Sequence, residues 1–307
     1  MNICSEEKFI ISLLFSEEIM DKKSVSKLNL EILIKILSQH LIIPLFYYKI
    51  CKKNLLNFFP KDFTNYTKKI YEINKKRNIH LKKEVEKINH LVNQNSMEII
   101  FLKGSAMIFS QIYSDLGIRM IGDIDFLIKS NDIKKIENTL ELNGYTELSD
   151  YDFFYPVRHL NRRVNKNKIF AIEPHIYLTN KKIINPNLIF EKKINSNVNT
   201  PSKLIMLKHN IYNFMINDRA LSKFTYSYRS IYDTFLLLEN IPEEKIQNDE
   251  LVLNYISAMK YLGIKHKKFT KTENNLYFYK FKFLNNSKNT YLVYLTVLKF
   301  CEKIKNK

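Results

Sequence analysis

Hydrophobic residues follow a helical spacing in the first third of the chain and again in the last third. In residues 63–92, apolar side chains recur every three or four positions, as along one face of a helix. These side chains are Tyr66, Ile70, Ile73, Leu81, Val85, Ile88 and Val92. Basic residues fill the opposite side, which we interpret as a solvated face. They are Lys68, Lys69, Lys75, Lys76, Arg77, Lys82 and Lys83.

The pattern changes between the two helical parts. Beyond Pro201, residues 202–216, 223–239 and 243–262 carry apolar stripes, whereas residues 97–102, 121–129 and 168–178 are β-branched and aromatic runs typical of strands. Helical spacing separates these runs at 106–116 and 133–143. We therefore predict an α+β fold in which a small mixed β-sheet core at residues 96–180 is flanked by an N-terminal helical region, 1–95, and a C-terminal helical region, 181–307.

Glycine is scarce and gathers in the predicted core, where four of the five glycines lie between residues 104 and 144. Gly144, before Tyr145, fits a helix C-cap that leads into a strand. Gly104 instead follows the apolar run at 97–102 and precedes Ser105, at the start of a predicted helix. Unpaired N–H groups at a helix start, with a glycine that lets an anion approach, can hold phosphate. Ser105 adds a hydroxyl and Lys103 a charge, although the same junction also occurs as a simple turn.

Two aspartates share one face of the predicted strand at 121–129. Because side chains alternate along a strand, Asp123 and Asp125 project together, about 7 Å apart at their Cα atoms. The opposite face carries Ile124, Phe126 and Ile128. Carboxylates so placed repel each other unless a cation lies between them, and such oxygen ligands suit Mg²⁺. The plain alternative, two surface acids on an edge strand, is disfavoured because strands rarely contain Asp.

A third carboxylate lies in the predicted strand at 168–178, where Glu173 and His175 share a face. If this strand lies beside the one at 121–129, Glu173 completes a three-carboxylate cluster able to hold two metal ions. We expect His175 to be a structural neighbour rather than a ligand. Pro174 cannot donate a ladder hydrogen bond, so the strand must be at an edge or bulged there.

The pattern as a whole resembles the nucleotidyltransferases of the DNA polymerase beta superfamily, and most closely a bacterial branch of that superfamily. That branch shows strand, Lys-Gly, helix, Arg, Asp-x-Asp and later an acidic residue shortly before His. The residues that carry the resemblance are Lys103, Gly104, Ser105, Arg119, Asp123, Asp125, Glu173 and His175. The resemblance spans residues 97–178, with a weaker one in the spacing of Arg229 and Asp233.

The resemblance implies a site and a reaction. Gly104 and Ser105, with Lys103 beside them, would hold the triphosphate of an NTP such as ATP, and Arg119 would neutralise phosphate charge. The implied ligands of Mg²⁺ or Mn²⁺ are Asp123, Asp125 and Glu173. The implied reaction moves a nucleoside monophosphate to a hydroxyl and releases pyrophosphate, with two cations at the attacking and leaving oxygens. The acceptor stays open among a small molecule, a sugar, a protein and RNA.

The charge of the chain allows other functions. Its 49 Lys and Arg against 31 Asp and Glu give a formal +18, which favours a polyanionic partner or substrate. Abundant Lys, Asn and Ile without Trp is also typical of an AT-rich genome, which explains part of the charge. Two alternatives therefore stay open. One is a catalytically inactive basic module that binds RNA or protein, and the other is a metal-dependent glycosyltransferase, which needs a nucleotide-binding sheet ahead of Asp-Ile-Asp.

The remaining features concern the compartment. Cys4, Cys51 and Cys301 lie far apart, which predicts neither a disulfide framework nor a zinc site. No run of about 18 apolar residues predicts a membrane span. The N-terminal segment lacks the basic start and small-residue cleavage site of a signal peptide. We therefore expect a cytoplasmic protein with reduced thiols.

Overall fold

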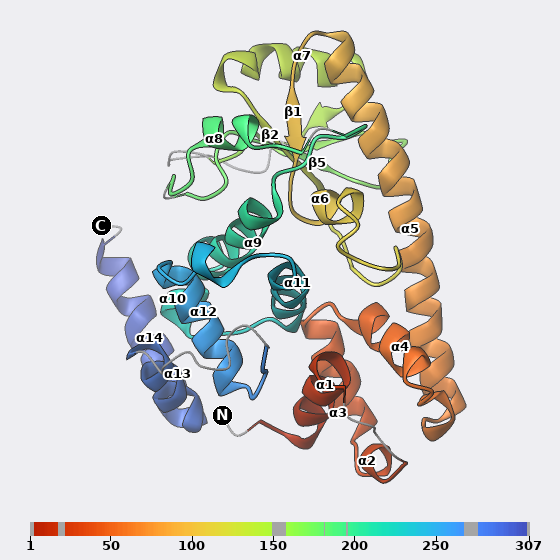
Figure 1. The fold of residues 1–307 in the computed structure, drawn as a ribbon, viewed down its shortest axis with the longest axis vertical. Coiled ribbons are helices and arrows are strands. Elements are labelled where there is room, and N and C mark those ends of the chain that lie inside the picture. Colours follow the sequence, from red (N-terminus) through yellow and green to blue (C-terminus); the bar gives the residue numbers. More distant parts are fainter. Residues whose placement is uncertain are drawn as a thin grey trace.

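The structure is a computed structural model, and it describes residues 3–17, 22–148, 158–180, 182–194, 196–266 and 276–305. A sheet with its covering helices lies at the top of Figure 1, and two groups of helices lie below it. The helices are α1 (Ser5–Phe15), α2 (Lys22–Ser26), α3 (Leu30–Gln39), α4 (Ile43–Lys52), α5 (Lys61–Gln94), α6 (Lys103–Phe109), α7 (Ile133–Leu142), α8 (Pro186–Glu191), α9 (Lys203–Tyr212), α10 (Ala220–Lys223), α11 (Tyr228–Leu238), α12 (Glu250–Tyr261), α13 (Leu276–Asn286) and α14 (Lys288–Lys305). The predicted α+β fold is confirmed.

The sheet has five strands in the order β1-β2-β5-β4-β3. The strands are β1 (Ile99–Phe101), β2 (Ile124–Ile128), β3 (Thr146–Glu147), β4 (Arg163–Val164) and β5 (Ile172–His175). β2 is antiparallel to β1 and parallel to β5, so the sheet is mixed. The two-residue strands β3 and β4 were not predicted, because two residues are too few to show a period of two.

β5 lies inside the sheet, so Pro174 is not on an edge strand. The ladder is bulged instead. Arg163 pairs with Ile172, but the next antiparallel bridge joins His159 to His175. Residues 160–162 therefore stand opposite residues 173–174, and the extra residue interrupts the ladder where proline lacks its donor. Of the two predicted arrangements, the bulge is the one that occurs.

One face of the sheet is apolar and packs against α5 and α7. The residues of this layer include Leu81, Val85 and Ile88 of α5, Ile136 and Leu140 of α7, and Ile124, Phe126, Ile128 and Ile172 of the sheet. The predicted alternation along β2 is thus confirmed. Because both neighbours of Asp125 in β2 face this core, Asp125 itself faces the opposite side.

In its first half the predicted stripe on α5 holds only at Ile70, which is half-buried against the core of the N-terminal and C-terminal helices. Tyr66 and Ile73 are 48% and 52% exposed, whereas Asn74 and Asn78 are buried. This half of α5 lies beside the loop before β2 rather than over the sheet, and both asparagine side chains donate to carbonyls of that loop. A loop backbone needs hydrogen-bond donors, so polar residues replace the apolar stripe there.

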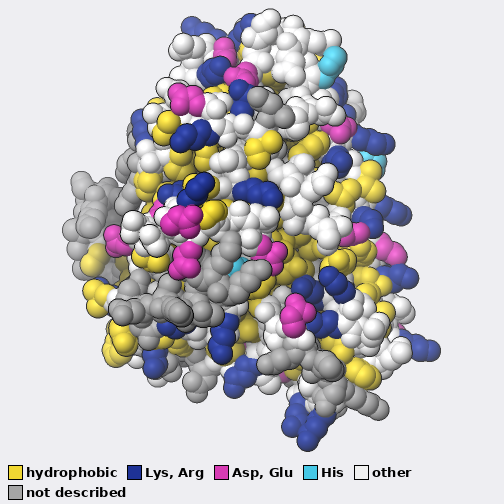
Figure 2. Space-filling model, in the orientation of Figure 1, with side chains coloured by type: hydrophobic (Ala, Val, Ile, Leu, Met, Phe, Trp, Pro, Cys, Tyr) yellow, Lys and Arg dark blue, Asp and Glu magenta, His cyan; other side chains and the backbone are white. Residues whose placement is uncertain are grey.

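The basic side of α5 is only partly solvated. Lys68, Lys69, Lys76 and Lys83 are exposed, and Figure 2 shows basic side chains along the edge formed by α5. Three of the predicted solvated residues instead contact the core. Lys75 pairs with Asp115 at 2.7 Å, Arg77 donates to the carbonyl of Gly122 at 3.0 Å, and Lys82 lies 5.4 Å from the ring of Phe109.

Several predicted helices are shorter than expected. α6 ends at Phe109 instead of continuing to residue 116, because the chain turns at Gln111 with a φ of 52°. The stretch 223–239 is broken at Phe224, also with positive φ. The stretch 202–216 is α9 followed by a π-helical turn, η3 (Asn213–Asn217). The short 3-10 segments are η1 (Leu56–Phe58), η2 (Ser130–Asp132) and η4 (Glu243–Lys245). The C-cap at Gly144 is as predicted, with a φ of 78°.

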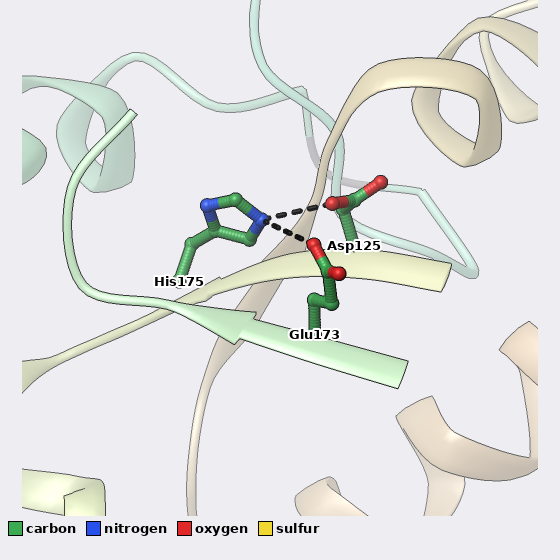
Figure 3. Close-up of side chains that lie close together, drawn as sticks. All are labelled: Asp125, Glu173 and His175. Atoms are coloured by element: carbon green, nitrogen blue, oxygen red, sulfur yellow. Dashed lines mark hydrogen bonds and ion pairs between the residues drawn. The ribbon is translucent and has the colours of Figure 1, made fainter. Parts of the chain in front are cut away.

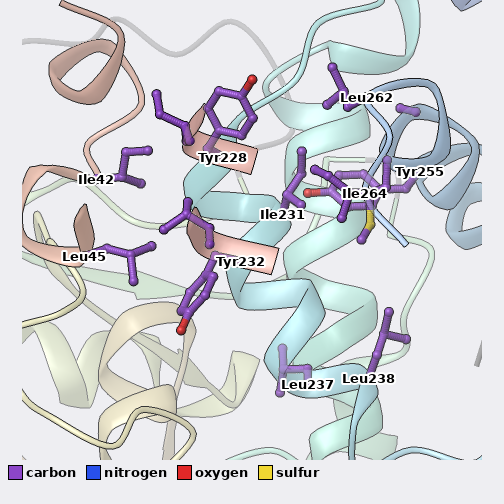
Figure 4. Close-up of a cluster of buried hydrophobic side chains, with 14 of the residues drawn as sticks. Ile42, Leu45, Tyr228, Ile231, Tyr232, Leu237, Leu238, Tyr255, Leu262 and Ile264 are labelled. Carbon is purple, nitrogen blue, oxygen red and sulfur yellow. The ribbon is translucent and has the colours of Figure 1, made fainter. Parts of the chain in front are cut away.

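The N-terminal and C-terminal helices share one hydrophobic core. Figure 4 shows Ile42 and Leu45 on one side and Tyr228, Ile231 and Tyr232 of α11 on the other. Met107 of α6 belongs to the same cluster, so this core reaches the helix that leaves β1. The division at residues 95 and 180 stays a prediction.

In the part of the chain described, no single helix is long and apolar enough to cross a membrane. α3 and α4 reach that length and apolarity only when taken as a pair, and the pair is bent by 120°.

Candidate active site

Two carboxylates and a histidine meet on the polar face of the sheet. Asp125 of β2 pairs in register with Glu173 of β5, so the two side chains stand next to each other. His175 projects from the same face of β5 two residues later. Its Nε2 lies 2.8 Å from Oδ1 of Asp125 and 3.8 Å from Oε2 of Glu173 (Figure 3). One ligand atom from each of the three lies within 4.8 Å of the others.

The charge states of the three groups differ. Burial raises the pKa of Asp125, but the nearby Lys103 and the hydrogen bond from His175 outweigh it, so the pKa is well below its usual value. Burial and the charge of Asp125 raise the pKa of Glu173. Burial lowers the pKa of His175 to about 4, so its ring is neutral near pH 7 and donates from Nε2 to Asp125.

Lys103 supplies the main cation at this cluster. Its Nζ lies 2.6 Å from Oδ1 of Asp125. The side chain is directed there because Lys103 adopts a left-handed φ of 48° between β1 and α6. Left-handed backbone at a non-glycine residue is strained, and such strain clusters at functional sites. The Leu102 N–H also donates to the backbone oxygen of Asp125, which fixes the start of α6 beside β2.

Gly104 and Ser105 are both buried at the start of α6. A Cβ on Gly104 would lie 2.6 Å from Nη1 of Arg119 and 2.8 Å from Cγ1 of Ile121. The absence of a side chain at Gly104 is therefore explained by the close approach of Arg119 and Ile121. The Ser105 hydroxyl is buried and has no hydrogen-bond partner in the described residues. The ion pair of Lys103 with Asp125 joins the start of α6, where Gly104 lies, to the carboxylates.

Arg119 is held by the C-terminal helices. Its Nε lies 3.0 Å from both oxygens of Asp233 on α11, and its Nη2 lies 2.8 Å from Oδ2. Tyr113 also donates to Asp233. From the other side, Asn78 donates to the Arg119 carbonyl at 2.8 Å, and so does Asn74 at 3.0 Å. The Arg119 loop is therefore fixed by α5 and α11 together.

Asp123 lies immediately before β2 and outside the group of three. It forms an ion pair with Arg162, which precedes β4. Its charge still acts on the site, because it contributes to the raised pKa of Glu173. Of the three carboxylates that the sequence singles out, the structure brings Asp125 and Glu173 together. Asp123 lies beside them but forms its ion pair with Arg162.

Sequence reasoning missed the residues that position this site: Asn74, Asn78, Arg162, and Asp233 as the partner of Arg119. Of these residues, only Asp233 could be singled out in the sequence, because it follows Arg229 by four positions, a spacing that resembles the family pattern. The asparagines of α5 carried none, because polar residues on a helix are usually solvated. Arg162 lies beside a strand too short to be recognised from its pattern.

Comparison with known proteins gives one match. A family model described as "Uncharacterised nucleotidyltransferase" matches residues 26–255, which include the sheet, α5, α9 and α11. Neither the curated proteins nor the solved structures contain a match. The family match agrees with the resemblance seen in the sequence. Since it covers well over half of the chain, this protein belongs to that family of nucleotidyltransferases.

Proposed function

We propose that this protein moves a nucleoside monophosphate from an NTP to a hydroxyl acceptor and releases pyrophosphate, with Mg²⁺ or Mn²⁺ at the carboxylates. The observation that carries the proposal is the in-register pairing of Asp125 with Glu173 beside the start of α6. The family supports nucleotidyl transfer in general, and these residues supply the specific chemistry.

The donor set fits a hard divalent cation. Asp125 and Glu173 offer carboxylate oxygens, the ligands that Mg²⁺ and Mn²⁺ favour. Asp123 would become a third metal ligand when its ion pair with Arg162 breaks. The three carboxylates together would then be able to hold two ions. The metal would supply charge neutralisation at the phosphates and polarisation of the reacting oxygens. His175 keeps the role of a neighbour that orients Asp125 by a hydrogen bond.

The groups of the chain would divide the remaining work. Lys103 forms an ion pair with Asp125. Once Asp125 holds a metal cation instead, Lys103 would bind phosphate oxygens. The first N–H groups of α6, at Gly104 and Ser105, would contact the triphosphate. Arg119 would contribute its positive charge from behind Gly104.

The transfer itself is a displacement at the α-phosphorus. The acceptor oxygen forms the new O–P bond while the bond from the α-phosphorus to the bridging oxygen breaks, and the electron pair leaves with pyrophosphate. The proton of the hydroxyl passes to Glu173. Glu173 would thus act as the general base of the transfer.

The experiment is transfer of label from an α-phosphate-labelled NTP, each of the four in turn, to the protein itself or to a cell extract, with Mg²⁺ or Mn²⁺. We expect labelling by the wild type and none by the double variant Asp123→Asn with Asp125→Asn. The control, Asp132→Asn with Glu141→Gln, removes two acids from η2 and α7 and should label normally. Label that survives in the Asp123 and Asp125 double variant would contradict the proposal.

The same experiment separates the two alternatives. A basic binding module would not transfer label, and its affinity for RNA would fall steeply with salt but would not change in the Asp123 and Asp125 variant. A glycosyltransferase would transfer label only from a nucleotide sugar. The described residues ahead of β1 form helices and turns without a strand, whereas that enzyme class needs a sheet there.

A further inference from the structure

A polar cavity of about 120 Å³ lies next to the carboxylates, between α6, α9 and α11. Its wall includes Lys103, Arg119, His209, Asn213 and Arg229. Lys103 belongs both to this wall and to the ion pair with Asp125, so the cavity adjoins the carboxylate site. Since about 10–15 Å³ of such volume holds one water molecule, the cavity has room for a group of several heavy atoms.

Arg229 is a cation in this wall without an acidic partner in the described residues. Asp233 lies one helical turn further along α11, but both of its oxygens accept hydrogen bonds from Arg119. Asp218, the other acid of the wall, is exposed and acts on Arg229 only through its charge. Burial and the charge of Arg119 lower the pKa of Arg229, and the charges of Asp233 and Asp218 offset this only in part. A partly buried arginine without a counter-ion is costly, and an anionic ligand would offset that cost.

His209 is a second, independent sign of a ligand. Its side chain on α9 is only 3% exposed and lines the cavity, and its Nε2 has no hydrogen-bond partner within the described part of the chain. Buried polar atoms are almost always paired, so an unpaired one in a cavity wall indicates a missing partner. Arg158 lies outside the wall but donates to Asn213 of the wall at 2.7 Å, and it adds positive charge nearby.

We propose that this cavity binds a phosphate group of the substrate, with Arg229 as its main contact and His209 as a hydrogen-bond partner. The proposal rests on the function proposed above, because the phosphate is assigned to a substrate of nucleotidyl transfer. Two sources share this chemistry: the terminal phosphates of the NTP and a phosphate on the acceptor. Neither Arg229 nor His209 is among the residues assigned to the metal or to the α6 start.

The test compares the full-length wild type with Arg229→Gln. The matched control is Lys245→Gln, which removes one exposed positive charge from η4. The first calorimetric titration adds each of the four NTPs, together with Mg²⁺, to the protein; ATP stands below for the NTP that binds. A second titration adds inorganic phosphate to protein saturated with an ATP analogue that has a methylene group between its α- and β-phosphorus. Thermal unfolding without ligand is measured for every variant.

The two titrations distinguish the sources. If the cavity holds the terminal phosphates of the NTP, Arg229→Gln weakens ATP binding roughly tenfold to a hundredfold, the value of a charge-assisted hydrogen bond. If it holds a phosphate of the acceptor, ATP binding is unchanged, but inorganic phosphate binds the analogue complex of the wild type and not that of Arg229→Gln. Arg229→Lys should retain part of the affinity, because it keeps the charge but loses the planar donor pair.

Unfolding separates a binding role from a structural one. Removing a cation without a counter-ion should leave the melting temperature of Arg229→Gln unchanged or higher, whereas a structural arginine would lower it. Titrations in which Arg229→Gln matches the wild type with both probes would overturn the cavity proposal alone. A wild type that binds no inorganic phosphate and none of the four NTPs would overturn the proposed function and the cavity together.

Discussion

Asp233→Asn tests how the C-terminal helices hold the site. Asp233 is fully buried on α11 and accepts hydrogen bonds from Arg119 at 2.8–3.0 Å and from Tyr113. Asparagine has nearly the same size but no charge. The variant therefore leaves the guanidinium of Arg119 buried without its counter-ion, and one oxygen that accepted hydrogen bonds becomes an amide donor.

The expected loss is large. Removing one partner of a buried ion pair costs about 3–5 kcal/mol. Arg119 cannot escape the cost by losing its proton, because arginine stays protonated in proteins even when it is buried. With an unfolding entropy of about 2.1 cal/mol/K per residue, the loss lowers the melting temperature of a chain of this length by roughly 5–8 °C.

The assay is thermal unfolding followed by circular dichroism. Glu72→Gln is the control, because it breaks an ion pair with Lys68 in which both side chains are about half exposed, and it should change stability by less than about 0.5 kcal/mol. A double variant, Arg119→Met with Asp233→Leu, should recover much of the stability but not nucleotidyl transfer. The reasoning is wrong if Asp233→Asn melts at the same temperature as Glu72→Gln.

Three further predictions concern packing and pH. Gly104→Ala places a Cβ 2.6 Å from the guanidinium of Arg119 and should cost about 1–3 kcal/mol in urea unfolding. Gly122→Ala, which has no atom within 4 Å of the added Cβ, should cost little, and equal losses would contradict the packing argument. Burial lowers the pKa of His40 to about 4 in the folded protein, whereas histidine in the unfolded chain has a pKa of about 6.5. Between these two pH values the unfolded chain binds a proton that the folded protein does not, so the free energy of unfolding falls as the pH drops from about 6.5 towards 4. His40→Phe should therefore remove roughly 2 kcal/mol of the stability lost between pH 7 and pH 5, and an unchanged loss would refute this. Because the pKa of Glu173 is raised, Mg²⁺ has to displace a proton from this carboxylate, and the affinity for Mg²⁺ should increase as the pH rises through that pKa. Calorimetry in two buffers with different ionisation enthalpies should detect the released proton. An affinity for Mg²⁺ that does not depend on pH would count against Glu173 as a ligand.

The local geometry of the site could be predicted from the sequence. Strand periodicity alone places Asp125 and Phe126 on opposite faces of β2, and the same rule places Glu173 and His175 on one face of β5. The pairing of the two strands could not be derived in this way. The register of Asp125 with Glu173 joins residues far apart in the chain, and no local pattern records it.

The contacts that position the site were beyond prediction for a different reason. Hydrophobic periodicity detects side chains that bury carbon, but Asn74 and Asn78 are buried to satisfy carbonyl groups of a loop. In the sequence they look like solvated positions of α5. The same holds for Arg162, whose partner Asp123 is known only once β4 is placed beside β5.

The pairing of charges distinguishes Glu173 from the other two acids. Asp125 has Lys103, and Asp123 has Arg162, so both are already compensated by cations of the chain. Glu173 has no lysine or arginine partner in the described residues, and its neighbour His175 is neutral near pH 7. Burial and the charge of Asp125 raise its pKa, and the more distant charges of Lys103 and Arg162 offset this only in part. A divalent cation would therefore change the protonation of Glu173 more than that of Asp125.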